Sequence, residues 1–342
     1  MRQGEGLVGS AETGSSRVPR VIARAALVMS LSAAAMIGAA HILPAGAWAE
    51  AVDVMTPLAA HVAIAVIGSL FALFWPRRAV ATLAAGAIVA LLVPPLMAGL
   101  STLEPWPVPT GNDVRDRLRV YALNSWDSAV EMARLERALR ESGADVLVLS
   151  EADPRKVAML ARLRPQFPYQ MSCAEQPVCA MAVLSRLPIV AGVAARKHYL
   201  VPPIAWVRID ASALGLGTVM VVGTHVHRPT RNAWVHAQQM RALGAMVAQT
   251  KGPLVLAGDF NAGPWSASFR QLRAMTGLVA VDPHTPTWPA HPVVFPQVAI
   301  DHILVSPHLV TTRSGVGAAV GSDHLPVVAE IGLRHGTLAN PR

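Results

Sequence analysis

The sequence is poor in charged and aromatic residues. Only 15% of the 342 residues are Asp, Glu, Lys or Arg, and 5% are aromatic, whereas soluble domains carry about 25% charged residues. Hydrophobic residues make up 53% of the chain, which excludes intrinsic disorder, and no collagen-like repeat or low-complexity tract is present. The apolar residues must therefore be concentrated in particular segments.

Charge is absent from three long runs in the first hundred residues, at 25–43, 57–75 and 79–100. A helix of about 19 residues is about 28 Å long, close to the hydrocarbon thickness of a bilayer. Buried helices of soluble domains normally carry a polar stripe, which these runs almost entirely lack. We expect residues 1–103 to form a membrane anchor of three transmembrane helices, followed by a proline-rich linker at 104–116.

The arginines predict the orientation of this anchor. Arg17, Arg20 and Arg24 precede the first run, Arg77 and Arg78 separate the second from the third, and the first loop has no basic residue. Because cytoplasmic flanks are enriched in Lys and Arg, we expect a cytoplasmic N-terminus and an extracytoplasmic domain after residue 103. Residues 47–49 resemble a signal-peptidase site, so the first run could instead be a cleaved signal, with the same final topology.

Cysteine is almost absent as well, with only Cys173 and Cys179 in the chain. An extracytoplasmic compartment permits disulfides. No Asp, His or further Cys lies between the two that could complete a metal site. The pair therefore favours a small structural disulfide over two free thiols.

After the linker, apolar β-rich runs alternate with helical patterns, which is typical of an α/β fold. Residues 117–335 are long enough for one catalytic domain with its own core. We predict helices at 127–142, 232–249 and 266–275, and strands at 118–123, 145–150, 180–184, 205–209, 218–223, 253–257, 299–305 and 326–331.

Polar residues follow or interrupt six of these apolar strands, and we expect them at the carboxyl ends, where α/β folds place ligands. Carboxylate and amide oxygens suit Mg²⁺, whereas imidazoles do not. The histidines are therefore better interpreted as acids, bases or phosphate contacts, and no HExxH zinc spacing occurs. The candidate residues are Asn124, Glu151, His225, Asp259, Asn261, Asp301, Asp323 and His324.

The motifs that hold these residues resemble the endonuclease/exonuclease/phosphatase (DNase I-like) superfamily. They are LSEAD, AVLSRLPI, GTHVHRP, LAGDFNAGP (256–264), IDHILVS and SDHLPV (322–327), in the family's order. The resemblance implies a four-layer sandwich of two packed β-sheets flanked by helices. It also implies a metal-dependent phosphoric-ester hydrolase that uses Mg²⁺, or Mn²⁺ in its place.

The family pattern implies that Glu151, supported by Asn124 and Asp323, binds the metal ion. The family commonly has Gln immediately before this Glu, where this chain has Ser150. That change weakens a supporting hydrogen bond without removing the metal ligand.

The same pattern implies the catalytic roles. Asp259 would orient or deprotonate the attacking water, and Asn261 would hold the phosphate or the nucleophile. His225 would hydrogen-bond a phosphoryl oxygen, while Asp301 would fix the tautomer of His324 and favour its imidazolium. The chemistry would be in-line displacement at phosphorus.

His227 and Arg228 directly follow His225. They could reach a substrate phosphate, and surface solvation is an equal alternative.

The substrate class stays open between three hypotheses. An anchored site is held near membrane-embedded substrates, which favours a lipid phosphate or polyprenyl pyrophosphate, and the architecture resembles bacterial membrane proteins associated with teicoplanin resistance. The alternatives are an anchored extracellular DNA nuclease and a non-enzymatic membrane scaffold. The net charge of +8 is scattered and supplies no dense Arg/Lys stripe for nucleic acid. No obligate protein partner is evident.

Overall fold

The computed structural model of the protein describes residues 21, 117–126, 131–176, 178–195, 198–282, 285–292, 294 and 298–333. The three expected membrane spans and the linker at 104–116 lie outside these residues. Among the helices that the described residues form, none combines the length and the apolar character needed to cross a bilayer.

The described strands form two six-stranded sheets of mixed direction. In the first sheet the spatial order is β11-β12-β1-β2-β4-β3, and only β1 and β2 run parallel. Its strands are β1 (Leu118–Asn124), β2 (Val146–Ser150), β3 (Tyr169–Ser172), β4 (Met181–Ser185), β11 (Leu309–Val316) and β12 (Val327–Leu333).

The second sheet has the order β5-β6-β7-β8-β10-β9, with β7 and β8 as its parallel pair. Its strands are β5 (Ile189–Ala195), β6 (Ile204–Asp210), β7 (Thr218–His225), β8 (Leu254–Asp259), β9 (Val279–Ala280) and β10 (Asp301–Val305). Each sheet thus carries one parallel pair near its centre.

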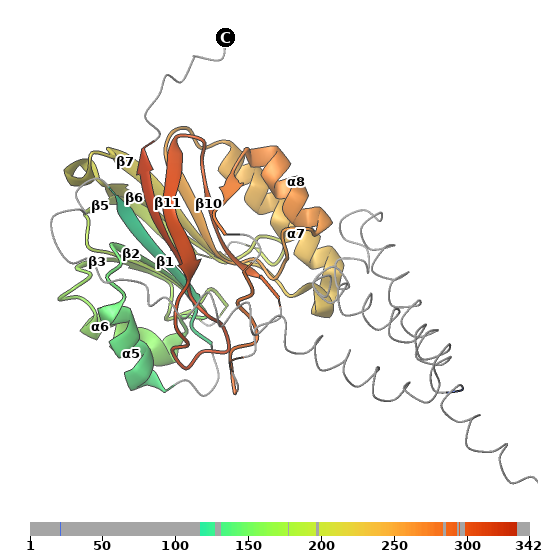
Figure 1. Ribbon diagram of the computed structural model, residues 1–342, viewed down its shortest axis with the longest axis horizontal. Helices are drawn as coiled ribbons and strands as arrows, with labels where there is room; N and C mark the ends of the chain where they lie inside the picture. The colour runs from blue at the N-terminus through green and yellow to red at the C-terminus, as the bar shows by residue number, and fades with distance from the viewer. Residues whose placement is uncertain are drawn as a thin grey trace, which may run out of the picture. The chain divides into compact units, whose positions relative to one another are not determined.

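The two sheets pack face to face, and helices cover both outer faces (Figure 1). Valines and isoleucines from both sheets, such as Val148 and Val221, form the core between them. Leu135 and Leu139 of α5 pack on the first sheet, and Leu243 of α7 packs on the second. The helices are α5 (Met132–Glu141), α6 (Val157–Arg162), α7 (Pro229–Ala248) and α8 (Ala267–Thr276), with 3₁₀ turns η2 (Pro154–Lys156) and η3 (Ser212–Leu214).

This arrangement confirms the expected α/β sandwich of two sheets flanked by helices. All eight predicted strands are present, and they are the central strands of the two sheets. The sequence analysis missed β3, β5, β9 and β11, which are the four edge strands. Edge strands are half exposed, so they lack the continuous apolar run that identifies a central strand.

The cysteine prediction is also confirmed, because Cys173 and Cys179 form a disulfide. The disulfide closes the loop between β3 and β4. Within that loop, the Ala180 carbonyl accepts a 2.9 Å hydrogen bond from the backbone N–H of Ala152. The loop is therefore tied to the segment that directly follows Glu151.

Candidate active site

Four predicted site residues lie where parallel strands end. Asn124 is the last residue of β1, and Glu151 directly follows β2, whose register pairs Asn124 with Ser150. In the other sheet, the register of β7 and β8 pairs His225 with Asp259. Both parallel pairs therefore bring their polar residues to a strand end, as the sequence predicted.

Asn261 follows Asp259 after the end of β8, but the expectation of carboxyl strand ends was wrong for the remaining three of the eight candidates. Asp301 is the first residue of β10, and Asp323 and His324 precede β12. Both strands are antiparallel to a neighbour whose carboxyl end carries site residues, and Asp301 pairs directly with Asp259. Because antiparallel strands run in opposite directions, the amino ends of β10 and β12 lie at the same edge as the carboxyl ends of β8 and β1.

Asn124 joins the two sheets through its side-chain amide. Its Nδ2 donates to Glu151 Oε1 at 3.0 Å and to Asp259 Oδ2 at 2.9 Å. Its Oδ1 accepts the backbone N–H of Trp126 at 3.0 Å. The structure thus shows Asn124 as a donor that holds two carboxylates together, and its predicted role as a metal ligand stays a prediction.

A buried lysine fixes the backbone beside Glu151. Glu151 and Trp126 both have a φ of 53°, a left-handed conformation that costs a residue with a Cβ about 1–3 kcal/mol. The Lys156 ammonium donates to the carbonyl oxygens of Trp126 at 2.7 Å and Glu151 at 2.9 Å. Lys156 is 1% exposed, so these bonds hold both turns in a water-poor environment.

The Asp259 turn depends on a glycine and on Asn261. Gly258 has a φ of 140°, and a Cβ there would lie 2.0 Å from the Thr224 carbonyl oxygen. The Asn261 backbone N–H donates to Asp259 Oδ1 at 2.8 Å, and its side-chain Nδ2 donates to the Val226 carbonyl at 2.9 Å. Asn261 thereby ties the end of β8 to the end of β7, and its predicted contact with phosphate stays a prediction.

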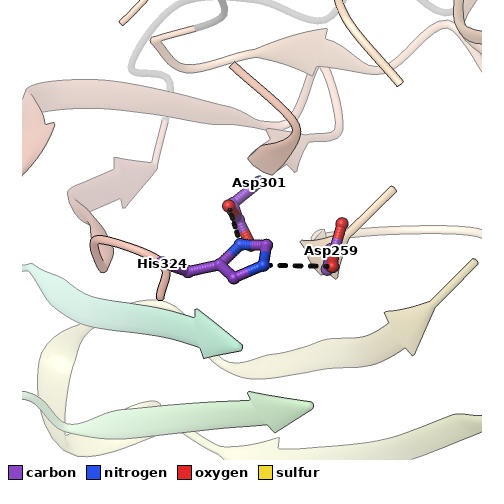
Figure 2. Close-up of side chains that lie close together, drawn as sticks. All are labelled: Asp259, Asp301 and His324. Carbon is purple, nitrogen blue, oxygen red and sulfur yellow. Dashed lines mark hydrogen bonds and ion pairs between the residues drawn. The ribbon is translucent and has the colours of Figure 1, made fainter. Parts of the chain in front are cut away.

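The imidazole of His324 lies between Asp301 and Asp259 (Figure 2). Its Nδ1 is 2.7 Å from Asp301 Oδ2, and its Nε2 is 3.9 Å from Asp259 Oδ2. Burial alone would lower the pKa of His324, but the charge and hydrogen bond of Asp301, together with the charges of Asp259 and Asp323, outweigh burial and raise the pKa to about 9. His324 is therefore a cation at neutral pH, and the pairing with Asp301 is as expected.

Asp259 is a fully buried carboxylate. Burial, followed by the negative charge of Asp301, raises its pKa, while the cationic His324 opposes the rise. His225 Nε2 lies 3.6 Å from Asp259 Oδ2 and 3.8 Å from Glu151 Oε1. A carboxylate with a raised pKa is a stronger base than an exposed one, which suits proton removal from water.

Asp323 also lies beside His324, with its Oδ1 3.9 Å from Nε2. Burial raises the pKa of Asp323, and the negative charge of Glu151 adds to the rise. The charge of His324 and a hydrogen bond from Trp288 oppose it. The Trp288 indole N–H donates to Asp323 Oδ2 at 3.2 Å. Ser322 anchors the segment, because its hydroxyl donates to the Asn124 carbonyl at 2.6 Å.

Two groups of residues could hold a metal ion. Asp259, Asp301 and His324 have one ligand atom each within 4.8 Å of one another. A protonated imidazole cannot ligate a cation, however, and His324 is held protonated by Asp301. Asp301 Oδ1 and Asp323 Oδ1 are both buried and accept no hydrogen bond. The Asp323 carboxylate is in addition repelled by the negative charge of Glu151. A divalent cation shared by Glu151 and Asp323 would relieve that repulsion.

A pocket of about 650 Å³ opens on these residues. Glu151, His225 and Asp323 line it, whereas Asp259, Asp301 and His324 are buried beside it. The remaining lining residues are Trp126, Asp153, Pro154, Val178, Cys179, Ala180, Pro203, Val226, His227, Arg228, Arg231 and Gln239.

Sequence reasoning missed Lys156, Ser322 and Gln239. Lys156 lies five residues after Glu151 in the chain, and Ser322 directly precedes Asp323, so proximity to a motif was an available signal. Their roles depend on bonds to backbone atoms distant in sequence. Nothing in the sequence indicated a role for Gln239, because it lies inside a helix, 12 residues from its partner His227.

The comparisons with known proteins place the chain in a family. The model of the Endonuclease/Exonuclease/phosphatase family matches residues 120–324, so the chain belongs to this family, whose name covers enzymes that act on phosphoric esters. Among curated proteins, none is significantly similar in sequence.

Solved structures share the fold at low sequence identity. An endonuclease/exonuclease/phosphatase from Beutenbergia cavernae is 22% identical over 64% of this chain and 72% of its own, with a TM-score of 0.50. A family member from Bacteroides vulgatus is 16% identical over 64% and 99%, with a TM-score of 0.53. D. rerio TDP2, complexed with a single-strand DNA product, is 14% identical over 63% and 99%, with a TM-score of 0.52.

Replacing Lys156 tests how the Glu151 turn is held. Lys156→Met keeps the buried stem but removes three donors, so the carbonyls of Trp126 and Glu151 lose their partner. We expect the free energy of unfolding, measured by chemical denaturation, to fall by about 2–4 kcal/mol. Lys251→Met, at an exposed position, should change it by less than about 0.5 kcal/mol. Equal stability of the two variants would contradict the assigned role.

Proposed function

We propose that the protein is a metal-dependent phosphoesterase that hydrolyses a phosphate ester or pyrophosphate. The observation that carries this proposal is the convergence of Glu151, Asp259 and His324, from three distant segments, beside one pocket. Asn124 links the first two through hydrogen bonds of 3.0 and 2.9 Å. The family of the chain supports phosphoric-ester hydrolysis as the reaction class.

Glu151 and Asp323, with Asn124 beside them, are the residues proposed to hold Mg²⁺ or Mn²⁺. The bound cation would polarise a phosphoryl oxygen and neutralise charge that develops during the reaction. Oxygen donors suit either ion. Lys156 and Asn124 contribute by fixing the Glu151 backbone and carboxylate before substrate arrives.

Asp259 is proposed to act on the attacking water. The water oxygen forms a bond to phosphorus opposite the leaving oxygen, whose bond to phosphorus breaks, and Asp259 accepts the water proton. The leaving oxygen takes up a proton from solvent. Asn261 keeps Asp259 in position through the 2.8 Å bond to Oδ1.

The histidines are proposed to stabilise the phosphoryl group. His225 is 22% exposed at its side chain and lines the pocket, so its Nε2 can donate to a phosphoryl oxygen. His324 is held as an imidazolium by Asp301, which places a fixed positive charge beside the reacting centre. Charges fixed before the reaction contribute most to catalysis of this kind.

The proposed substrate is a membrane lipid intermediate on the extracytoplasmic side. The three apolar runs and the arginine distribution support membrane anchoring and this orientation, and the Cys173–Cys179 disulfide is typical of an oxidising compartment. Trp126, Val178 and Pro203 add apolar surface to the pocket lining, and Val178 is 64% exposed. The resemblance to membrane proteins associated with teicoplanin resistance favours the same class.

An anchored DNA nuclease is the second candidate. Its support is the similarity of fold to D. rerio TDP2, whose structure contains a single-strand DNA product. At 14% sequence identity, the similarity between the two proteins extends only to the fold. The basic residues are also scattered along the sequence and form no dense Arg/Lys stripe of the kind that favours nucleic acid.

The activity proposal is tested with the full-length protein, Mg²⁺, and three substrates: plasmid DNA, sphingomyelin and a polyprenyl pyrophosphate. We expect turnover of the polyprenyl pyrophosphate, its loss on chelation with EDTA, and a fall of about a thousandfold or more in Asp259→Asn. Asp210→Asn, at a half-buried strand end that does not line the pocket, is the matched control. Cleavage of DNA alone would establish the nuclease, and inactivity on all three substrates would favour a scaffold.

The proposed topology has its own test. A C-terminal alkaline phosphatase fusion should be active and a C-terminal green fluorescent protein fusion dark, because the domain is expected outside the cytoplasmic membrane. The opposite pattern would place the domain in the cytoplasm and contradict the proposed localisation.

A further inference from the structure

The pocket has a basic wall, which consists of His225, His227, Arg228 and Arg231. These residues come from the end of β7, the short loop that follows it and the first turn of α7. The proposed reaction uses only His225 among them. The other three extend the positively charged surface beyond the carboxylates that are proposed to hold the metal ion.

The acidic residues near the pocket neutralise this wall only in part, through Glu151 and Asp259 beside His225 and Glu151 beside Arg228. Asp153 is paired with Arg155 and Lys156, whose ammonium is 3.7 Å from Asp153 Oδ1. Arg228 Nη2 lies 3.6 Å from Glu151 Oε1, which is an ion pair without a direct hydrogen bond. Within the part of the chain that the structure describes, the guanidinium of Arg231 has no carboxylate partner.

A buried glutamine holds the basic wall in place. Gln239 is 1% exposed, and its Oε1 accepts the backbone N–H of His227 at 2.8 Å while its Nε2 donates to the Tyr199 carbonyl at 2.7 Å. The Arg231 backbone N–H donates to the Arg228 carbonyl at 3.0 Å, so one turn presents both arginines. The backbone of this wall is therefore fixed before any ligand binds, which lowers the entropic cost of binding.

The charge of the wall selects among phosphorylated substrates. An internal phosphodiester carries one negative charge, whereas a terminal diphosphate carries up to three. Guanidinium groups bind phosphate oxygens through two parallel hydrogen bonds. Two arginines next to His225 and the carboxylates that are proposed to hold a cation exceed what one phosphodiester group requires.

We propose that the pocket binds diphosphate esters, with one phosphoryl group beside Glu151 and His225 and the second at Arg228 and Arg231. This inference rests on the proposed phosphoesterase function and specifies its substrate class. The alcohol of the ester could be a lipid or a nucleoside, since both supply the same diphosphate.

In the reaction, the water oxygen bonds to the phosphorus beside Glu151, and the bond from that phosphorus to the bridging oxygen breaks. The bridging oxygen leaves with the phosphoryl group held by Arg228 and Arg231, whose positive charges stabilise it. One phosphate monoester and one inorganic phosphate are formed, and both protons of the water are retained on the products or released to solvent.

The experiment compares Arg231→Gln with Arg208→Gln in the full-length protein. Arg208 is exposed on β6 and does not line the pocket. Three probes are hydrolysed with Mg²⁺ present: geranyl diphosphate, ADP and bis(p-nitrophenyl) phosphate. We expect Arg231→Gln to lower kcat/KM for the diphosphates at least tenfold more than for the diester, and Arg208→Gln to leave all three within twofold. A preference of the wild type for geranyl diphosphate or for ADP identifies the lipid or nucleoside source.

Binding separates this inference from the proposed function. Imidodiphosphate, whose P–N–P bridge resists hydrolysis, should bind more tightly than inorganic phosphate in calorimetry, and Arg231→Gln should weaken it at least tenfold. Equal losses on diester and diphosphates, or equal binding of imidodiphosphate and phosphate, would overturn the diphosphate inference while leaving phosphoesterase activity intact. Absence of turnover on every probe would instead remove the proposed function.

Discussion

The structure depends on the concentration of buried negative charge at one edge of the two packed sheets. Glu151, Asp259, Asp301 and Asp323 converge there, and three of them are almost fully buried. Such a group is unfavourable unless donors and cations offset it. The Asn124 amide and the imidazolium of His324 offset part of the charge, and Asp323 retains a buried oxygen without a hydrogen bond. The remaining imbalance is the physical reason to expect a divalent cation.

The packed sheets provide the rigidity that this convergence requires. Each sheet has one parallel pair, so two strand ends in each sheet reach the same edge with their polar residues in register. The last positions are adjusted locally: Gly258 lets β8 approach the Thr224 backbone, Lys156 holds two left-handed residues, and Ser322 connects the His324 segment to Asn124. A site assembled from rigid strands and short hydrogen-bonded turns keeps its geometry in the absence of substrate.

Much of this fold could be predicted from the sequence, since central strands are continuous apolar runs and all eight were found. The edge strands β3, β5, β9 and β11 were missed because each pairs with a neighbour on one side only and is partly exposed, so its sequence is not a continuous apolar run. Motif order indicated which residues share the site, but not the direction of their strands, so Asp301 and His324 were expected at the wrong strand ends. Lys156 and Gln239 act through backbone atoms that only the folded chain brings near. The positive charge of Arg231 was visible in the sequence, and its place in the pocket was not.

A single measurement tests directly whether Glu151 and Asp323 share a divalent cation while Asp259, Asp301 and His324 form a separate acid–base group. Anomalous X-ray scattering from crystals of the full-length protein grown with Mn²⁺ locates the ion without relying on activity. We predict one strong peak between the carboxylates of Glu151 and Asp323, at the floor of the pocket. A peak among Asp259, Asp301 and His324, with none beside Glu151, would contradict the assignment of base and metal ligands.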